Sequence, residues 1–197
     1  MDSRISIREY APADLEQIIA LHARIEPYRP GDEPAVAAMH ARASSAKQAG
    51  DRWVAPQTSI DRIDDTAGSY AAFWVAVANA DGSDEVAGMV GVRRGVDLRE
   101  LGDPALLARW ADRDDPAELR RLRVAPEQWG RGIGRQLTEA VIGWAREHGV
   151  RTIALNTTTP QAPARALYES LGFREVGLSF IGRYELVWYE LALAAEG

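Results

Sequence analysis

The sequence contains no cysteine and no long hydrophobic run, and each absence excludes a class of protein. Without cysteine the chain forms no disulfide, no thiolate metal site and no cysteine nucleophile. No apolar stretch reaches the roughly 18–20 residues that cross a bilayer, and the start MDSRISIREY lacks the apolar core of a signal peptide. We therefore expect a cytoplasmic protein that has no membrane partner.

The chain also lacks an excess of positive charge. Its 23 Lys and Arg residues stand against 29 Asp and Glu residues, so the net charge is −6. Proteins that bind nucleic acid need cationic surface for the phosphates, so this composition argues against a nucleic-acid partner. The 197 residues, 46% of them hydrophobic, suffice for a full core, and we expect one domain over residues 1–197.

Metal ligands are scarce as well. The three histidines, His22, His40 and His148, are scattered along the chain without the spacing of metal ligands. Because cysteine is absent too, the sequence predicts no metal site.

Hydrophobic periodicity predicts a mixed α/β protein. Alternating or continuous apolar runs predict strands, and apolar residues three and four apart predict helices. Strands are expected at residues 4–9, 71–78, 86–94, 118–124, 152–156, 175–179 and 184–191, and helices near residues 15–26, 34–50, 106–110, 133–149 and 164–171. Turn residues at 79–83 predict that the second and third of these strands form an antiparallel hairpin.

Charge is unevenly distributed in the middle of the chain. Residues 97–118 carry seven acids and three arginines, whereas residues 119–135 carry five arginines and one acid. A cationic cluster inside an acidic chain suits a small anion better than a polyanion. A solvated charged face gives the same pattern, so charge alone does not decide between them.

Three glycines lie between a predicted strand and a predicted amphipathic helix, in the segment WGRGIG at residues 129–134. Glycine lets backbone N–H groups approach a bound group without a Cβ in the way. The N-terminus of the following helix offers unpaired N–H donors and partial positive charge, and Arg131 and Arg135 add formal charge. The pattern predicts a pyrophosphate-binding loop. A glycine-rich connection that only allows close strand–helix packing is the alternative.

Two other phosphate-binding loops do not fit this segment. A Walker loop ends in Gly-Lys-Ser or Gly-Lys-Thr, and the chain contains neither tripeptide. A dinucleotide fingerprint that begins at Gly130 and Gly132 needs a third glycine at the position of Arg135.

Two motifs in the second half of the chain resemble those of the GCN5-related N-acetyltransferases, the GNAT family. The acetyl-CoA-binding signature of that family, Arg/Gln-x-x-Gly-x-Gly/Ala, is similar to residues 129–134. Gly132 and Gly134 match its glycines, and Trp129 replaces Arg or Gln. Downstream, ARALYESLGF at residues 164–173 resembles the second hallmark of the family. The resemblance covers residues 85–193 by motif and residues 4–79 only by the order of elements.

The resemblance implies the GNAT-like fold and its mode of coenzyme binding. The fold class is α/β, with a mostly antiparallel sheet of about six to seven strands, a splayed parallel pair at residues 118–124 and 152–156, and about four flanking helices. Acetyl-CoA is expected between the splayed strands, with its pantetheine arm on the backbone of Leu122 and Val124. The residues implied to bind acetyl-CoA are Leu122, Val124, Arg131, Gly132, Ile133, Gly134, Arg135 and Gln161.

The resemblance also implies direct attack of an amine on the thioester, with no covalent enzyme intermediate. Glu118 is the candidate general base, because an ammonium must lose a proton before it attacks; a surface acid paired with an arginine is the alternative. Tyr168 is the candidate acid that protonates the departing CoA thiolate, and packing of its ring is the alternative. A strand amide near Leu122 is expected to hold the oxyanion.

The acceptor stays open at this stage: a primary amine of a small molecule or of a peptide. Residues 26–29, Trp110, and the acids Asp112, Asp114 and Asp115 are candidates for acceptor contacts. A homodimer is common for this fold. Two other functions remain as alternatives, a non-catalytic acyl-CoA-binding or regulatory module with the same fold and an unrelated α/β nucleotide-binding protein.

Overall fold

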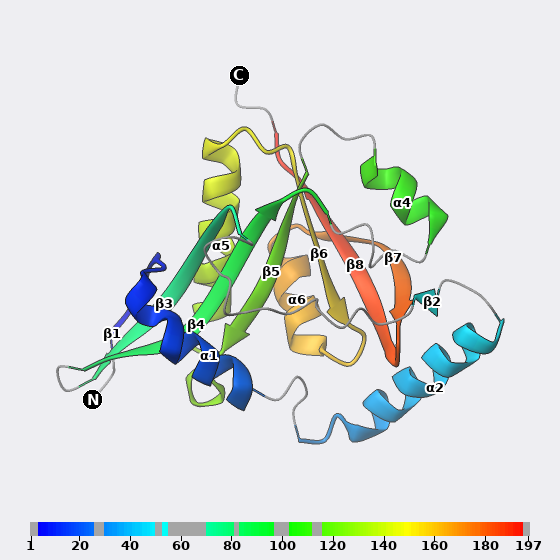
Figure 1. Ribbon diagram of the computed structural model, residues 1–197, viewed down its shortest axis with the longest axis horizontal. Helices are drawn as coiled ribbons and strands as arrows, with labels where there is room; N and C mark the ends of the chain where they lie inside the picture. Colours follow the sequence, from blue (N-terminus) through cyan, green and yellow to red (C-terminus); the bar gives the residue numbers. More distant parts are fainter. Residues whose placement is uncertain are drawn as a thin grey trace. The chain divides into compact units, whose positions relative to one another are not determined.

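A computed structural model describes residues 4–25, 30–49, 53–54, 70–80, 83–96, 103–111 and 116–194 (Figure 1). The chain divides into two compact units. The first comprises residues 1–26, 61–94 and 119–149, and the second comprises residues 27–60, 95–118 and 150–197. Strand β5 (Pro116–Val124) contributes residues to both units.

The first unit contains antiparallel strands in the order β1-β3-β4, followed by the later part of β5. Its remaining elements are β1 (Arg4–Glu9), β3 (Ala72–Ala80), β4 (Ser83–Arg94), the short 3-10 helices η1 (Pro12–Asp14) and η3 (Pro126–Gln128), α1 (Leu15–Arg24) and α5 (Ile133–Glu147). The pairing of β3 with β4 confirms the predicted hairpin.

Helices α1 and α5 cover opposite faces of these strands (Figure 1). Met89 of β4 belongs to a buried cluster with Ile18 and Leu21 of α1. A Cβ on the neighbouring Gly88 would lie 3.1 Å from the Leu137 side chain of α5 and 3.0 Å from the Arg123 carbonyl oxygen. Since successive strand residues point to opposite faces, the two helices pack on the two sides.

An ion pair between the buried Asp14 and the partly exposed Arg8 fixes the start of α1 against β1. Asp14, 5% exposed, accepts hydrogen bonds from both terminal nitrogens of Arg8 at 2.7 and 2.8 Å and from the Ala11 amide at 2.8 Å. The Arg8 hydrogen bonds lower the pKa of the Asp14 carboxyl below its ordinary 3.8, although burial opposes the shift. A lowered pKa means that the stabilisation is complete above the ordinary pKa and is lost as the pH falls through the lowered one.

Asp14→Asn is expected to reduce the free energy of unfolding by roughly 1–3 kcal/mol at neutral pH, because it removes a charged acceptor from three donors. The difference between the variant and the parent should shrink in acid, where Asp14 is protonated. Urea unfolding at neutral and acidic pH measures both. Glu16→Gln, at an exposed position of α1, is the matched control. An equal loss at both pH values would contradict the ionic account.

The second unit contains the order β5-β6-β8-β7-β2, with only the first residues of β5. Pairs β6–β8 and β8–β7 are antiparallel, and pairs β5–β6 and β7–β2 are parallel. Its elements are β2 (Trp53–Val54), β6 (Thr152–Thr158), β7 (Arg174–Ile181), β8 (Tyr184–Ala192), α2 (Glu33–Ala49), α4 (Pro104–Ala111) and α6 (Ala162–Ser170).

Helix α4 packs closely on this second set of strands. Trp110 is 3% exposed, and its ring centroid lies 5.4 Å from that of Trp188 in β8. Its indole N–H donates to the Glu190 carboxylate at 3.1 Å. A Cβ on Gly177 of β7 would lie 2.9 Å from Leu106, so glycine allows this close approach. Trp110 therefore supplies core volume between α4 and β8.

The predicted fold class is confirmed, including the parallel pairing of β5 with β6. The described residues contain five α-helices, the number predicted from periodicity, and eight strands, one more than predicted. The extra strand is β2, whose two residues are too few to give a periodic signal. No helix in the described ranges is long and apolar enough to span a membrane.

Candidate active site

The loop between β5 and α5 has the backbone geometry of an anion-binding turn. Gly130 and Gly132 adopt φ of +80° and +77°, in the left-handed region that favours glycine. A Cβ at either position would meet no atom within 4 Å. Open space at both positions disfavours the alternative in which these glycines exist only to let the strand and the helix pack closely.

Backbone amides at the start of α5 are available as hydrogen-bond donors to a ligand. The Gln136 N–H donates to the Gly132 carbonyl oxygen at 3.1 Å. In the described part of the chain, the amides of Gly132, Ile133 and Gly134 have no hydrogen-bond acceptor. Unpaired N–H groups at a helix N-terminus carry partial positive charge, so the turn fits a diphosphate.

Arginines flank this turn. The Arg131 guanidinium donates to the Gln128 side-chain oxygen at 2.5 Å, and Arg135 lies 3.6 Å from Glu139 on the next turn of α5. Both members of the second pair are about half exposed, so solvent screens their attraction. Both guanidinium groups therefore stay near the loop and keep their positive charge there.

Trp129 occupies the position where the family signature has Arg or Gln. Its indole N–H donates to the carbonyl oxygen of Val124 at 2.9 Å, while 36% of the residue is exposed. This bond ties the loop to the end of β5. The Arg123 side chain donates in the same way to the Leu122 carbonyl at 3.1 Å. Since a carbonyl oxygen has two lone pairs, both carbonyls can still accept a further donor.

Arg121 was missed by the sequence analysis. It has φ of +62°, the one positive value at a non-glycine residue in the described ranges. Such a conformation costs about 1–3 kcal/mol and often occurs at functional sites. Its guanidinium Nε donates to the Tyr70 hydroxyl at 3.0 Å. Regular strand geometry breaks immediately before the Leu122 amide that is the candidate oxyanion donor; no residue type in the sequence signals this.

Glu118 lies in the second unit, where β5 pairs with β6, opposite Ala154. It is fully buried, with 0% of its surface exposed. The alternative of an exposed surface acid is therefore wrong. A glutamate is rarely fully buried unless it has a partner, so its position is specified by the fold.

Tyr168 lies on α6 and is 5% exposed. Its ring makes an edge contact with Phe173 at 5.7 Å between centroids and a tilted contact with Tyr189 at 6.1 Å. Gly172 ends the helix with φ of +90°, and the Phe173 amide donates back to the Tyr168 carbonyl at 3.1 Å. In the Leu-Gly-Phe part of the hallmark, Gly172 thus ends α6 and Phe173 packs against the Tyr168 ring.

Tyr189 of β8 is a second residue that the sequence analysis missed. Its buried hydroxyl donates to Glu169 at 3.0 Å and accepts from Arg165 at 3.1 Å. Burial is the main cause that raises the pKa of this hydroxyl. The three residues hold α6, and with it Tyr168, against β8.

Gln161 immediately precedes α6. Its side-chain oxygen accepts from the Thr157 hydroxyl at 2.6 Å and from the Thr158 amide at 3.3 Å. The expected contact of Gln161 with the coenzyme arm therefore depends on its side-chain nitrogen.

The expected site residues fall in both units. Leu122, Val124 and residues 131–135 lie in the first, and Glu118, Gln161 and Tyr168 lie in the second. Residues 26–29 and 112–115, expected to contact the acceptor, lie outside the described residues. No group of three or more His, Asp or Glu side chains in the described ranges could hold a metal ion.

Comparison with known proteins agrees with this geometry. The model of the Acetyltransferase (GNAT) family matches residues 37–173, and the chain belongs to this family.

Among curated relatives, the chain is 33% identical to human (Homo sapiens) N-acetyltransferase 8B over 140 residues, which are 68% of this chain and 54% of that protein. It is 35% identical to N-acetylaspartate synthetase of Rattus norvegicus over 122 residues, 62% of this chain and 33% of the relative. The chain thus spans about half or less of the length of these relatives. The crystal structure of Arabidopsis thaliana NAA60 in complex with acetyl-CoA has a TM-score of 0.66 at 19% identity, over 96% of this chain and 99% of that one.

Proposed function

We propose that the protein is an acetyl-CoA-dependent N-acetyltransferase that transfers an acetyl group to the primary amine of a small molecule or a peptide. The observation that carries the proposal is the open turn in which the amides of Gly132, Ile133 and Gly134 have no acceptor in the described residues. Membership of the acetyltransferase family and the acetyl-CoA complex of a protein with the same fold support it.

Each part of acetyl-CoA is proposed to bind a particular group of the chain. The amides from Arg131 through Arg135 bind the diphosphate, and the two arginine side chains add charge. Backbone groups of Leu122 and Val124 pair with the amides of the pantetheine arm, and the Gln161 side-chain nitrogen contacts the same arm. Bound acetyl-CoA supplies the reactive thioester.

The chemistry follows from the remaining residues. Glu118, directly or through water, accepts the proton of the acceptor ammonium, and the free amine attacks the thioester carbon. A strand amide at Leu122, turned by the Arg121 conformation, stabilises the oxyanion. When the carbon–sulfur bond breaks, the Tyr168 hydroxyl gives a proton to the CoA sulfur.

The experiment is a panel of small amines and peptides, incubated with acetyl-CoA and followed by release of free CoA thiol. We expect release that depends on one class of amine, with the acetylated amine found by mass spectrometry. Tight binding of acetyl-CoA without release for any amine would favour the non-catalytic module. Competition by ATP or NAD as strong as that by CoA would favour an unrelated nucleotide-binding protein.

Glu118→Gln is expected to lower the transfer rate by about 10²–10⁴-fold where the acceptor is protonated, because the amide cannot take up the proton. The loss should be largest at low pH and smaller toward the pKa of the amine, about 10 for an alkylamine. The pH profile of kcat/KM measures this. Glu16→Gln, at an exposed position of α1, is the control. A loss that does not change with pH would make Glu118 structural.

A further inference from the structure

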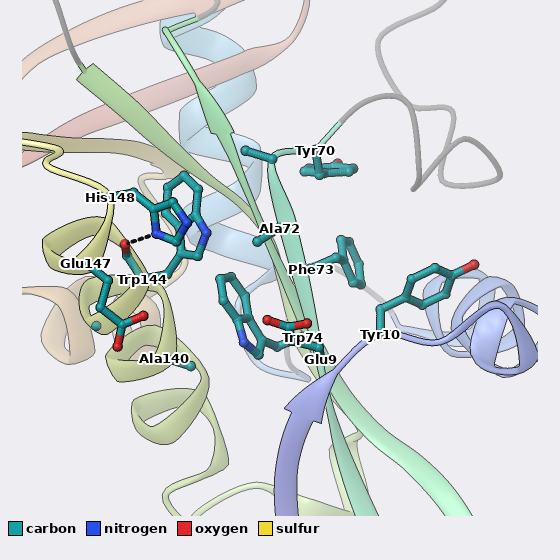
Figure 2. Close-up of a pocket in the computed structure, with 12 residues that line it drawn as sticks. Glu9, Tyr10, Tyr70, Ala72, Phe73, Trp74, Ala140, Trp144, Glu147 and His148 are labelled. Atoms are coloured by element: carbon teal, nitrogen blue, oxygen red, sulfur yellow. Dashed lines mark hydrogen bonds between the residues drawn. The ribbon is translucent and has the colours of Figure 1, made fainter.

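A pocket of about 650 Å³ lies in the first unit, away from the coenzyme loop (Figure 2). It is formed by the C-terminal half of α5, the start of β3 and the end of β1. Small side chains open it: Ala140 and Gly143 come from α5 and Ala72 comes from β3. A Cβ on Gly143 would meet no atom within 4 Å. The volume is within the range of small-molecule sites, roughly 300–1,000 Å³.

Two tryptophans form the aromatic wall. Trp74 of β3 and Trp144 of α5 are 7% and 9% exposed, and Figure 2 shows the Trp144 ring together with His148 on the α5 side and Trp74 on the β3 side. His148 stacks on Trp144 at 4.5 Å between centroids, and the Arg94 guanidinium lies 5.6 Å from the Trp144 ring. Trp74 has no such ring or cation partner among the described residues. The part of its indole that lines the pocket is therefore available to contact a ligand.

The charged residues of the pocket carry one sign. Glu9 and Glu147 line it and are exposed, and in the described ranges neither carboxylate has an ion pair or a hydrogen bond. Among the described residues that line the pocket there is no Lys or Arg. Arg94, the cation near Trp144, donates to the His148 carbonyl at 3.2 Å. Figure 2 shows the Glu9 carboxylate beside the Trp74 indole, while Glu147 lines the pocket from α5, and acidic groups beside an aromatic ring are the complement of an organic cation.

We propose that this pocket binds an organic ammonium ion with an apolar substituent. The ammonium group lies by Glu9 and the Trp74 indole, Glu147 adds negative charge from the α5 side, and the substituent fills the space beside Ala140 and Gly143. The site shares no residue with those assigned to acetyl-CoA. Binding at the pocket can therefore be measured without the coenzyme.

The test uses benzyltrimethylammonium and its uncharged carbon isostere, neopentylbenzene, without acetyl-CoA. The two probes have the same shape, so their difference reports charge alone. We expect saturable 1:1 binding of the cation, followed by tryptophan fluorescence and calorimetry, and at least about tenfold weaker binding of the isostere. Equal binding of the two probes, or no saturable binding of the cation, would overturn the proposal.

Variants identify the groups that bind. The double variant Glu9→Gln, Glu147→Gln should weaken cation binding by about tenfold or more and leave isostere binding unchanged. The double variant Glu16→Gln, Glu33→Gln changes the net charge equally at exposed positions outside the pocket and should bind like the parent. Undiminished binding in the first variant would place the cation elsewhere and overturn the proposal.

A blocking variant tests the location independently of charge. Gly143→Leu places a side chain in the open space and should abolish binding of both probes, with an unfolding midpoint no lower than that of the parent, since glycine is a poor helix residue. Gly143→Ala, with only a methyl group added, is the matched control and should keep most of the affinity. Full affinity in folded Gly143→Leu would exclude this pocket. If Gly143→Leu does not fold, the binding of the cation to the Glu9→Gln, Glu147→Gln variant still tests whether the pocket is the site.

Discussion

Gly132→Asp is expected to reduce acetyl-CoA affinity by at least about a hundredfold while the fold stays intact. The substitution places a carboxylate where the diphosphate is proposed to bind, and juxtaposed like charges cost several kcal/mol. A side chain here meets no atom within 4 Å, and Asp tolerates a positive φ better than most residues, so the backbone should persist. Calorimetry with acetyl-CoA measures the affinity, and circular dichroism with thermal unfolding measures the fold.

Gly149→Asp is the matched control for this experiment. Gly149 follows the other end of α5, has φ of +71° and likewise has no atom within 4 Å of an added Cβ. The same substitution there should leave acetyl-CoA affinity unchanged, with a small loss of stability from an acid near a helix C-terminus. Equal acetyl-CoA affinity of the parent and Gly132→Asp would mean that the diphosphate does not bind at this loop.

Tyr168→Phe is expected to slow acetyl transfer by roughly 10²–10⁴-fold, the usual contribution of a positioned acid. Acetyl-CoA affinity should change little, because the ring and its contacts with Phe173 and Tyr189 remain. Steady-state kinetics with the best amine, together with acetyl-CoA titration, separates kcat from binding. An unchanged kcat would mean that Tyr168 only packs against its neighbours.

Tyr189→Phe controls for the loss of a buried hydroxyl. It removes hydrogen bonds with Arg165 and Glu169, so the free energy of unfolding should fall by about 1–3 kcal/mol. Its kcat should fall much less than that of Tyr168→Phe, since Tyr189 acts on α6 through its neighbours. A larger loss of kcat in Tyr189→Phe than in Tyr168→Phe would mean that Tyr168 is not the residue that protonates the CoA thiolate.

Local elements of the fold could be predicted because their signals lie within a few residues. The stripe of Ile133, Leu137, Val141 and Trp144 defines α5, and all four are buried as the helical period requires. Gly130 and Gly132 of the loop have the positive φ values that make glycine necessary there. The motif match also indicated the parallel strand pair, which periodicity alone does not show.

Other features of the site could not be predicted, because they depend on residues distant in the sequence. A glutamate is usually exposed, yet Glu118 is fully buried in its strand pair. Nothing in the sequence around Arg121 indicates a left-handed backbone, which persists beside a hydrogen bond to Tyr70. The bond from Trp129 to Val124 likewise depends on how the loop folds back on β5.

The sequence by itself determined the helices, the strands and the glycine turn at the start of α5, because backbone preference and hydrophobic period are set by neighbouring residues. Only the tertiary structure decided which polar groups are buried, which carbonyls receive a side-chain donor, and that Trp74 and Trp144 face one pocket with Glu9 and Glu147. Burial and partners depend on which distant segments pack together, and that packing is a property of the whole fold.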